Sequence, residues 1–389
     1  MGMRFGGWAA ALMFLMFSSA VCGSGKDLDR CAPALPAPQL AQAPAIDDAA
    51  RLLAGLPPAE HSTLAAVAGT AMWQRYARQL ESSFAKLESQ QLAPMRKWRE
   101  TELADHPATH GPVFYPFSGP DLVYLLNLFP DAHTYVLTGL EPVGKMPALD
   151  ASDLASLDRR LRSVSRALYA LLEFSFFRTN DLSANLDDGQ ADGVIPILLL
   201  FLERMDYQIL ALERFRLDVA GQWCTLDERA LKKSDVAGVR LHFLRRGERV
   251  VRQLIYLSAD IGDAGLARTP QYEAYIRALD PQAVLYKSAS YLPHKPYFSR
   301  IRALSLQQAR LLLQDDSGIP LKSFDPALWD RQLYGRYVGP IALFSNMRQA
   351  DLSAAFAKAT PPPLPFSFGY QHRRGTSGVM LFVRRVPSG

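Results

Sequence analysis

The stretch VFYPFSGPDLVYLLNLF (113–129) changes its apolar period within a few residues, and this change limits the fold more than any other feature. VFYPF has the composition of a strand, Ser-Gly-Pro-Asp marks a tight turn, and the apolar run after it has the spacing of a helix. A second strand is predicted within HTYVLTGLEP (133–142). Strand–helix–strand units build parallel sheets, so the sequence predicts an α/β fold with a mostly parallel, Rossmann-like sheet.

Long helices and antiparallel hairpins are predicted around this sheet. Apolar residues recur every three or four positions in 153–177 and in 194–216, which predicts two long helices. Alternating segments on either side of Gly247 predict a β-hairpin at 239–260. A short helix is predicted at 329–337.

The chain is expected to have five parts. Ala and Pro dominate the segment after the N-terminal apolar run, and PPPLP interrupts the chain near its C-terminal end. The predicted parts are a signal peptide at 1–22, an Ala/Pro-rich tether at 23–46, an N-terminal helical segment at 47–110, an α/β core at 111–359 with a helical insertion at 152–217, and a C-terminal hairpin at 360–389.

The N-terminal segment has the pattern of a Sec signal peptide. Arg4 precedes the apolar run WAAALMFLMF (8–17), and small residues follow it. The run is too short to cross a bilayer, so we expect a periplasmic or secreted protein with no integral membrane span after cleavage. Cys22 also suggests a lipoprotein, but Ser19-Ala20-Val21 lacks the Leu and the small residue that usually precede a lipidated cysteine.

The cysteines support a disulfide in an oxidising compartment. Cleavage after Cys22 or Gly23 leaves Cys31 and Cys224, which predicts a Cys31–Cys224 bond. Cleavage after Ala20 leaves all three cysteines and makes Cys22–Cys31 a rival pair.

The net charge of +5 and the isoelectric point near 9.0 favour anionic partners. An exported protein rarely meets nucleic acid, so we expect an anionic envelope polymer or another envelope protein as partner, and no nucleic acid. The basic residues are scattered along the chain and create no focused field, so a merely solvated surface explains this charge better.

The turn after the first predicted strand is a candidate site. Pro120 removes a backbone donor, and the Asp121 carboxylate occupies the position that a phosphate would need, so the turn is not a phosphate cradle. No cofactor is predicted. Ser118 is expected to cap the following helix, and a nucleophilic Ser118 is the alternative.

A carboxylate pair and a histidine are further catalytic candidates. The segment 298–313 is predicted to be helical, and Asp315 and Asp316 are expected to follow its end. A carboxylate at the C-terminal end of a helix is unfavourable. The pair is therefore either compensated by nearby Arg or Lys residues, part of a turn, or available for acid–base work on a glycoside. His294 is a candidate partner. His106 and His110 have the spacing of a metal pair but lack a third ligand, so no metal site is predicted.

Several polar residues share one property, which is that each follows a predicted strand. The carboxyl ends of parallel strands meet at one crevice, so these side chains are expected to converge there. The alternative is that each satisfies backbone groups in its own turn. The residues are Ser118, Asp121, Glu141, Asp260, Lys287, Ser290 and His294.

Two resemblances accompany these residues. The strand–turn–helix order around FSGPD resembles the first unit of a class I methyltransferase in degenerate form, without its glycines. YPFSGPD, YVLTGLEP and QDDSGIP together resemble an uncharacterised family of exported bacterial proteins, over about residues 110–345. These resemblances imply a Rossmann-like fold and no particular activity.

Two functions follow as hypotheses. The first is a periplasmic or envelope-associated binding or accessory protein, because no complete catalytic set is evident. The second is a hydrolase of an envelope glycan or peptide, which would use Asp121, Asp315 or Asp316 with His294 or Ser118.

Overall fold

The computed structural model describes residues 43–385 except 148, 150–151, 175–192, 227–231, 233 and 372–374. The predicted signal peptide, nearly all of the tether, and Cys22 and Cys31 therefore lie outside the described residues. None of the described helices is long and apolar enough to cross a membrane.

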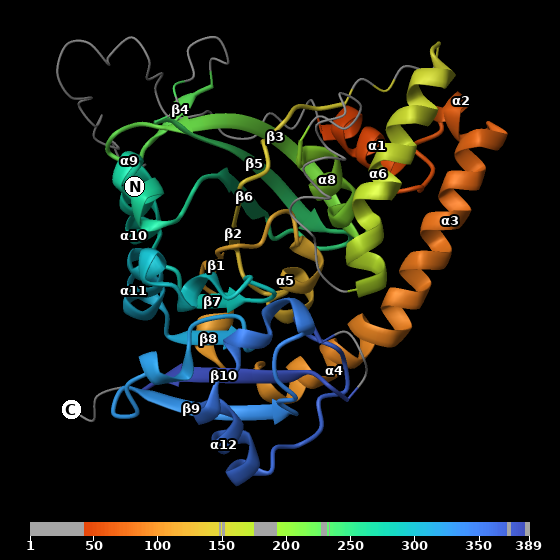
Figure 1. The fold of residues 1–389 in the computed structure, drawn as a ribbon. Coiled ribbons are helices and arrows are strands. Elements are labelled where there is room, and N and C mark those ends of the chain that lie inside the picture. The colour runs from red at the N-terminus through yellow and green to blue at the C-terminus, as the bar shows by residue number, and fades with distance from the viewer. Residues whose placement is uncertain are drawn as a thin grey trace, which may run out of the picture.

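A ten-stranded mixed sheet is the centre of the molecule, in the order β4-β3-β5-β6-β2-β1-β7-β8-β10-β9 (Figure 1). The five central strands, from β6 to β8, are parallel, and the strands at both ends of the sheet pair antiparallel. The strands are β1 (Val113–Tyr115), β2 (Thr134–Gly139), β3 (Tyr207–Leu217), β4 (Trp223–Thr225), β5 (Val236–Arg245), β6 (Arg252–Ser258), β7 (Ala283–Tyr286), β8 (Leu311–Gln314), β9 (Trp329–Gly335) and β10 (Gly378–Arg384).

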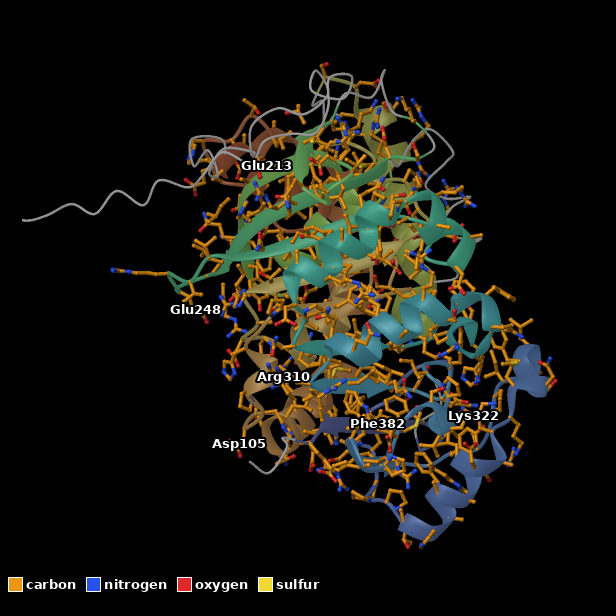
Figure 2. All side chains as sticks on the ribbon, turned by 90° about the vertical axis from the view of Figure 1, so that its left-hand side faces the viewer. Asp105, Glu213, Glu248, Arg310, Lys322 and Phe382 are labelled. Carbon is orange, nitrogen blue, oxygen red and sulfur yellow. The ribbon has the colours of Figure 1, made fainter. Side chains whose placement is uncertain are left out.

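Helices cover both faces of the sheet. One face carries α1 (Ala43–Leu53), α2 (Ala65–Ala68), α3 (Ala71–Leu87), the π-helical turn Glu88–Leu92, α4 (Ala93–Glu102), α5 (Leu122–Leu128), α6 (Leu154–Phe174) and α8 (Ile195–Arg204). The other carries α9 (Asp263–Arg268), α10 (Pro270–Leu279), α11 (Ser299–Gln308) and α12 (Ala350–Ala359). Figure 2 views the molecule from the side of α9, α10 and α11 and shows them lying over the sheet.

Alternate residues of the central strands supply two apolar cores. Val113 and Tyr115 of β1 point into the core under α3, α5 and α8, whereas Phe114 between them points into the core under α10 and α11. Burial on both faces explains why these strands are continuously apolar rather than alternating in polarity.

The prediction of a mostly parallel sheet is wrong, because antiparallel pairings outnumber the parallel ones. The hairpin predicted at 239–260 is present as β5 and β6, with Gly247 in the left-handed region at φ 84°. Its strand β5 pairs further with β3, which extends the antiparallel part of the sheet.

One predicted helix is a strand, and another is a strand in its second half. The segment predicted as a helix at 194–216 divides, since α8 ends at Arg204 and Tyr207–Leu217 is β3. Asp206, at φ 63°, reverses the chain between them. The segment predicted as a helix at 329–337 is the edge strand β9. In both segments, pairing with a distant strand outweighs the local periodicity.

The C-terminal segment is not a hairpin of its own. Strand β10 lies between β8 and β9, and it pairs antiparallel with both. The segment 366–371 makes only an isolated bridge between Phe368 and Gln371. The predicted 298–313 helix ends at Gln308, and β8 follows, so Asp315 and Asp316 come after a strand.

Candidate functional site

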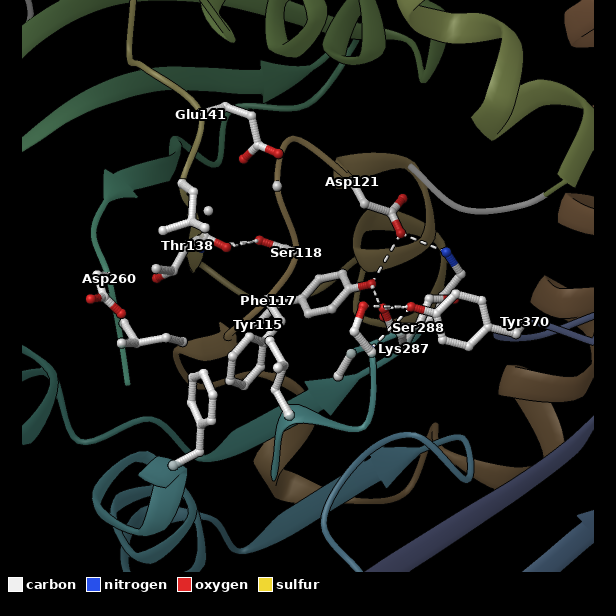
Figure 3. Close-up of a pocket in the computed structure, with 18 of the residues that line it drawn as sticks. Tyr115, Phe117, Ser118, Asp121, Thr138, Glu141, Asp260, Lys287, Ser288 and Tyr370 are labelled. Carbon is white, nitrogen blue, oxygen red and sulfur yellow. Dashed lines mark hydrogen bonds and ion pairs between the residues drawn. The ribbon is translucent and has the colours of Figure 1, made fainter. Parts of the chain in front are cut away.

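A crevice opens at the carboxyl ends of the parallel strands, where the chain order reverses. After β1 the chain enters β2 on one side, whereas β7 lies on the other side of β1. Helices start on different sheet faces around this switch point and leave a gap between the strand ends. The crevice has a volume of about 660 Å³, and its walls come from the ends of β1, β2, β6 and β7, from residues 341–344 and from Tyr370 (Figure 3).

Six of the seven strand-end residues line this crevice. His294 is the exception. The six come from four strand ends and are Ser118, Asp121, Glu141, Asp260, Lys287 and Ser290.

Ser118 fastens β1 to β2 and does not cap the helix. Its hydroxyl donates to the Thr138 carbonyl at 3.1 Å and accepts from the Thr138 N–H at 3.0 Å. The N-cap position of α5 belongs to Asp121, whose side chain makes no capping bond. The prediction of a Ser118 cap is therefore wrong, because the hydroxyl instead satisfies backbone groups of the neighbouring strand. Because both bonds hold the Ser118 hydroxyl against β2, this hydroxyl is not free to act as a nucleophile.

A buried ion pair forms part of the crevice wall. Lys287 Nζ lies 2.7 Å from Asp121 Oδ2, and both side chains are nearly inaccessible to solvent. The Tyr115 hydroxyl donates to the same carboxylate oxygen at 3.0 Å, and Lys287 Nζ lies 3.9 Å from the centre of the Tyr124 ring. The other oxygen, Asp121 Oδ1, has no hydrogen-bond partner among the described residues. Asp121 thus faces a cation, an arrangement that the sequence did not reveal.

Glu141 is a buried carboxylate that makes no ion pair in the described part of the chain. It is 3% exposed, and burial raises the pKa of its carboxyl group. The Tyr256 hydroxyl donates to its backbone carbonyl at 3.0 Å and approaches Oε2 at 3.2 Å. Both carboxylate oxygens lie over Gly119, and a side chain at Gly139 would collide with Oε2. The two glycines therefore leave room for this carboxylate at the crevice.

Asp260 lies at the open side of the crevice. Its side chain is half exposed, pairs with Arg268 at 2.9 Å and accepts from the Gly262 N–H at 3.0 Å. Asp260 and Asp121 are thus each paired with a cation, and Glu141 is the lining carboxylate for which the described residues provide no ion pair. Such a site disfavours an anionic ligand.

The loop after β7 holds an unusual backbone conformation. Ser288, Ser290 and Tyr291 have φ of 53°, 52° and 53°, a region that side chains disfavour. The Tyr370 hydroxyl donates to the Ser288 carbonyl at 2.8 Å and accepts from the Ser290 N–H at 3.1 Å. Strained backbone conformations of this kind cluster at functional sites, where the surrounding contacts hold a loop in one conformation.

Asp315 and Asp316 do not line the crevice. Asp315 accepts hydrogen bonds from the N–H groups of Ser288 and Ser317, each at 3.0 Å. The bond to Ser288 stabilises the loop after β7. Asp316 accepts from the Tyr291 hydroxyl at 2.6 Å. Burial and the neighbouring Asp315 raise the pKa of Asp316 to about 7. Both carboxylates therefore bind the chain's own groups.

His294 lies in the 3₁₀ turn Leu292–His294. Burial lowers the pKa of its imidazole to about 4, and its Nε2 has no hydrogen-bond partner among the described residues. A neutral, half-buried ring outside the crevice is poorly placed for acid–base chemistry on a ligand bound there.

The sequence analysis did not identify the five aromatic lining residues as site residues: Tyr115, Phe117, Phe298, Phe344 and Tyr370. Tyr115 and Phe117 belong to the FYPF stretch, whose apolar character predicts only a strand. Phe344 and Tyr370 come from loops that carry no local sign of proximity.

No group of three or more potential metal ligands occurs in the described ranges. No protein-family model, curated protein or solved structure matches the chain.

Proposed function

We propose that this chain is an exported, periplasmic or envelope-associated binding protein, whose ligand is a small uncharged or cationic molecule with neighbouring hydroxyl groups. Nucleosides and glycosides share this chemistry. The charge balance of the crevice argues against phosphorylated ligands and against an anionic polymer inside it. The export and the envelope partner are predictions from the sequence.

Glu141 is the observation that carries the proposal. A carboxylate accepts hydrogen bonds from two neighbouring hydroxyl groups, and hydrogen bonds to a charged acceptor are the strong ones. In dinucleotide-binding folds, an acidic residue about 20 residues after the first turn accepts a bond from a ribose hydroxyl. Glu141 follows the Gly119 turn by a similar interval and lies over that turn, and the described residues place no cation in an ion pair with it.

The strand order supports a Rossmann-like centre and the weak likeness to class I methyltransferases. Numbered along the chain, the parallel strands β6-β2-β1-β7-β8 have the order 3-2-1-4-5, which is that of doubly wound folds. The glycine-poor turn and Pro120 separate the chain from a regular nucleotide cradle. We therefore propose binding rather than group transfer.

The hydrolase alternative is the weaker proposal. It needs Asp315, Asp316 or Asp121 as acid–base groups with His294 or Ser118, yet only Asp121 and Ser118 line the crevice. Ser118 binds the β2 backbone, and Asp121 is paired with Lys287.

The test is calorimetric titration of the mature protein with adenosine, methyl β-glucoside and N-acetylglucosamine. We expect either the nucleoside or a sugar compound to bind. The result decides between a nucleoside and a sugar as the ligand. Glu141→Gln should weaken that binding roughly 10- to 100-fold, the value of a charge-assisted hydrogen bond.

Glu100→Gln is the matched control, because Glu100 is an exposed carboxylate that does not line the crevice. It should bind like the wild type. Failure of all three compounds, or equal binding by the wild type and Glu141→Gln, would contradict the proposal.

A further inference from the structure

We infer that the crevice has a second, apolar subsite, and that the ligand carries an alkyl or aryl group in addition to its hydroxyl groups. The inference rests on the proposed function and names its ligand more closely. The apolar subsite consists of Leu292, Ile341, Leu343, Phe344 and Tyr370.

Exposed apolar side chains mark the mouth of the crevice. Leu343 is 77% exposed although it belongs to the lining, and Leu140, also in the lining, is 65% exposed. They come from separate segments, the loop between β9 and α12 and the end of β2. Large apolar side chains exposed around a pocket mark binding surfaces, because water contact is unfavourable for them.

Tyr370 presents its ring rather than its hydroxyl group. The hydroxyl is engaged with the Ser288 carbonyl and with the Ser290 N–H and Oγ, all within 3.1 Å. The Phe344 ring lies 5.1 Å from the Tyr370 ring, and Tyr291 stacks behind Tyr370 at 6.4 Å. The two lining rings therefore offer a ligand apolar surface, not hydrogen bonds.

This wall is fixed before any ligand arrives. Ser288 and Ser290, both in the left-handed region, are hydrogen-bonded to Tyr370. The Ser288 N–H also donates to Asp315 Oδ2 at 3.0 Å. Gly369 leaves room for the Asp315 carboxylate beside Tyr370, because a side chain there would collide with Oδ2. A preformed wall lowers the ordering cost of binding.

The size of the crevice agrees with a two-part ligand. A volume of about 660 Å³ is in the range that holds drug-sized ligands, and such pockets combine apolar walls with a few placed polar groups. Glu141 and Asp260 lie at the ends of β2 and β6, whereas the apolar subsite adjoins the β7 loop. A single sugar or ribose bound at Glu141 would leave the apolar subsite empty.

The experiment compares ligand pairs that differ only in the apolar group. One pair is methyl and octyl β-glucoside, used below the micelle concentration, and the other is adenosine and 5′-S-phenyl-5′-thioadenosine. We expect the added group to strengthen binding to the wild type roughly tenfold, as burial of one large apolar group would. The two pairs also distinguish an alkyl from an aryl group.

Leu343→Ser should remove most of the gain in affinity that the added apolar group gives. It should leave the binding of the parent compound unchanged. Phe344→Ala is the second variant. Leu328→Ser is the matched control, because Leu328 is also an exposed leucine but does not line the crevice. The control should keep the full gain.

The outcomes separate the two proposals. Parent binding that depends on Glu141, without any gain from the apolar group, overturns the apolar subsite and leaves the proposed function standing. An equal loss of the gain in Leu343→Ser and Leu328→Ser also overturns the subsite. If no member of either pair binds and N-acetylglucosamine also fails to bind, both proposals fall.

Discussion

Lys287 and Asp121 show how a residue acquires its role from a distant partner. The turn sequence places Asp121 beside a helix start, where a carboxylate is favourable. In the folded chain its charge is balanced instead by Lys287, at the end of a strand far along the sequence. A charge buried this deeply needs such a partner, since an unpaired one is strongly unfavourable.

Removing one partner should therefore harm the fold more than removing both. We expect Lys287→Met to lower the free energy of unfolding by about 3–5 kcal/mol, because Asp121 is left buried without a cation. Asp121→Leu combined with Lys287→Met should recover most of that loss. Urea unfolding of the single and double variants measures it, and equal losses in both would show that the pair is not coupled.

At the scale of elements, a charge cluster attaches α1 to the rest of the molecule. Arg246, in the β5–β6 hairpin, contacts Asp47 of α1 at 3.0 Å and Glu203 of α8 at 2.8 Å. Asp47 also accepts the Ile209 N–H of β3 at 2.9 Å. Burial and the neighbouring Asp47 raise the pKa of Glu203 to about 9, against the opposing effect of Arg246.

This cluster predicts a pH dependence of stability. The pKa of Glu203 is higher in the folded than in the unfolded chain, so its favourable contribution is complete below about pH 4.5 and is lost as the pH rises toward 9. Glu203→Gln cannot ionise, so its stability relative to the wild type should rise between pH 5 and pH 8. Urea unfolding at both pH values tests this, and a flat or falling difference would contradict it.

At the scale of the whole molecule, the parallel centre and its antiparallel flanks have different roles. The central strands end at the crevice, whereas β4, β3 and β5 extend the sheet at one edge and β10 and β9 at the other. Cys224 is buried in β4, at the edge of the sheet. Its predicted partner, Cys31, lies outside the described residues, so the pairing stays a prediction.

A Cys31–Cys224 bond would tie the N-terminal tail to this edge. We expect peptide mapping of the non-reduced protein to find that link, and Cys224→Ser to lower the free energy of unfolding by about 2–4 kcal/mol. A Cys22–Cys31 link in the same map would contradict the prediction and indicate cleavage before Cys22.

The first unit of the fold was predictable because its signals are local. Residues 113–142 switch from a strand to a turn to a helix and back to a strand, and the structure has β1, α5 and β2 there. The β5–β6 hairpin was predictable from Gly247 and its flanks. In contrast, β3 and β9 have apolar spacings that suit a helix locally, and only their pairing with β5 and β10 makes them strands.

The crevice was predictable in part for a related reason. The carboxyl ends of β1, β2, β6 and β7 meet at the crevice, so Glu141, Asp260 and Lys287 could be placed from their positions after these strands. His294 could not, because the turn after β7 takes it away from the lining. Tyr370 and Phe344 could not either, since no parallel strand precedes them.

The sequence by itself determined the α/β class and the strand-end positions of six lining residues, since both depend on neighbours along the chain. Tertiary structure alone decided the strand directions at the sheet edges, the pairing of Asp121 with Lys287 and the burial of Glu141 beside Tyr256. It also turned Asp315 and Asp316 away from the crevice. These features depend on contacts between distant segments, whose energies are set only when the whole chain packs.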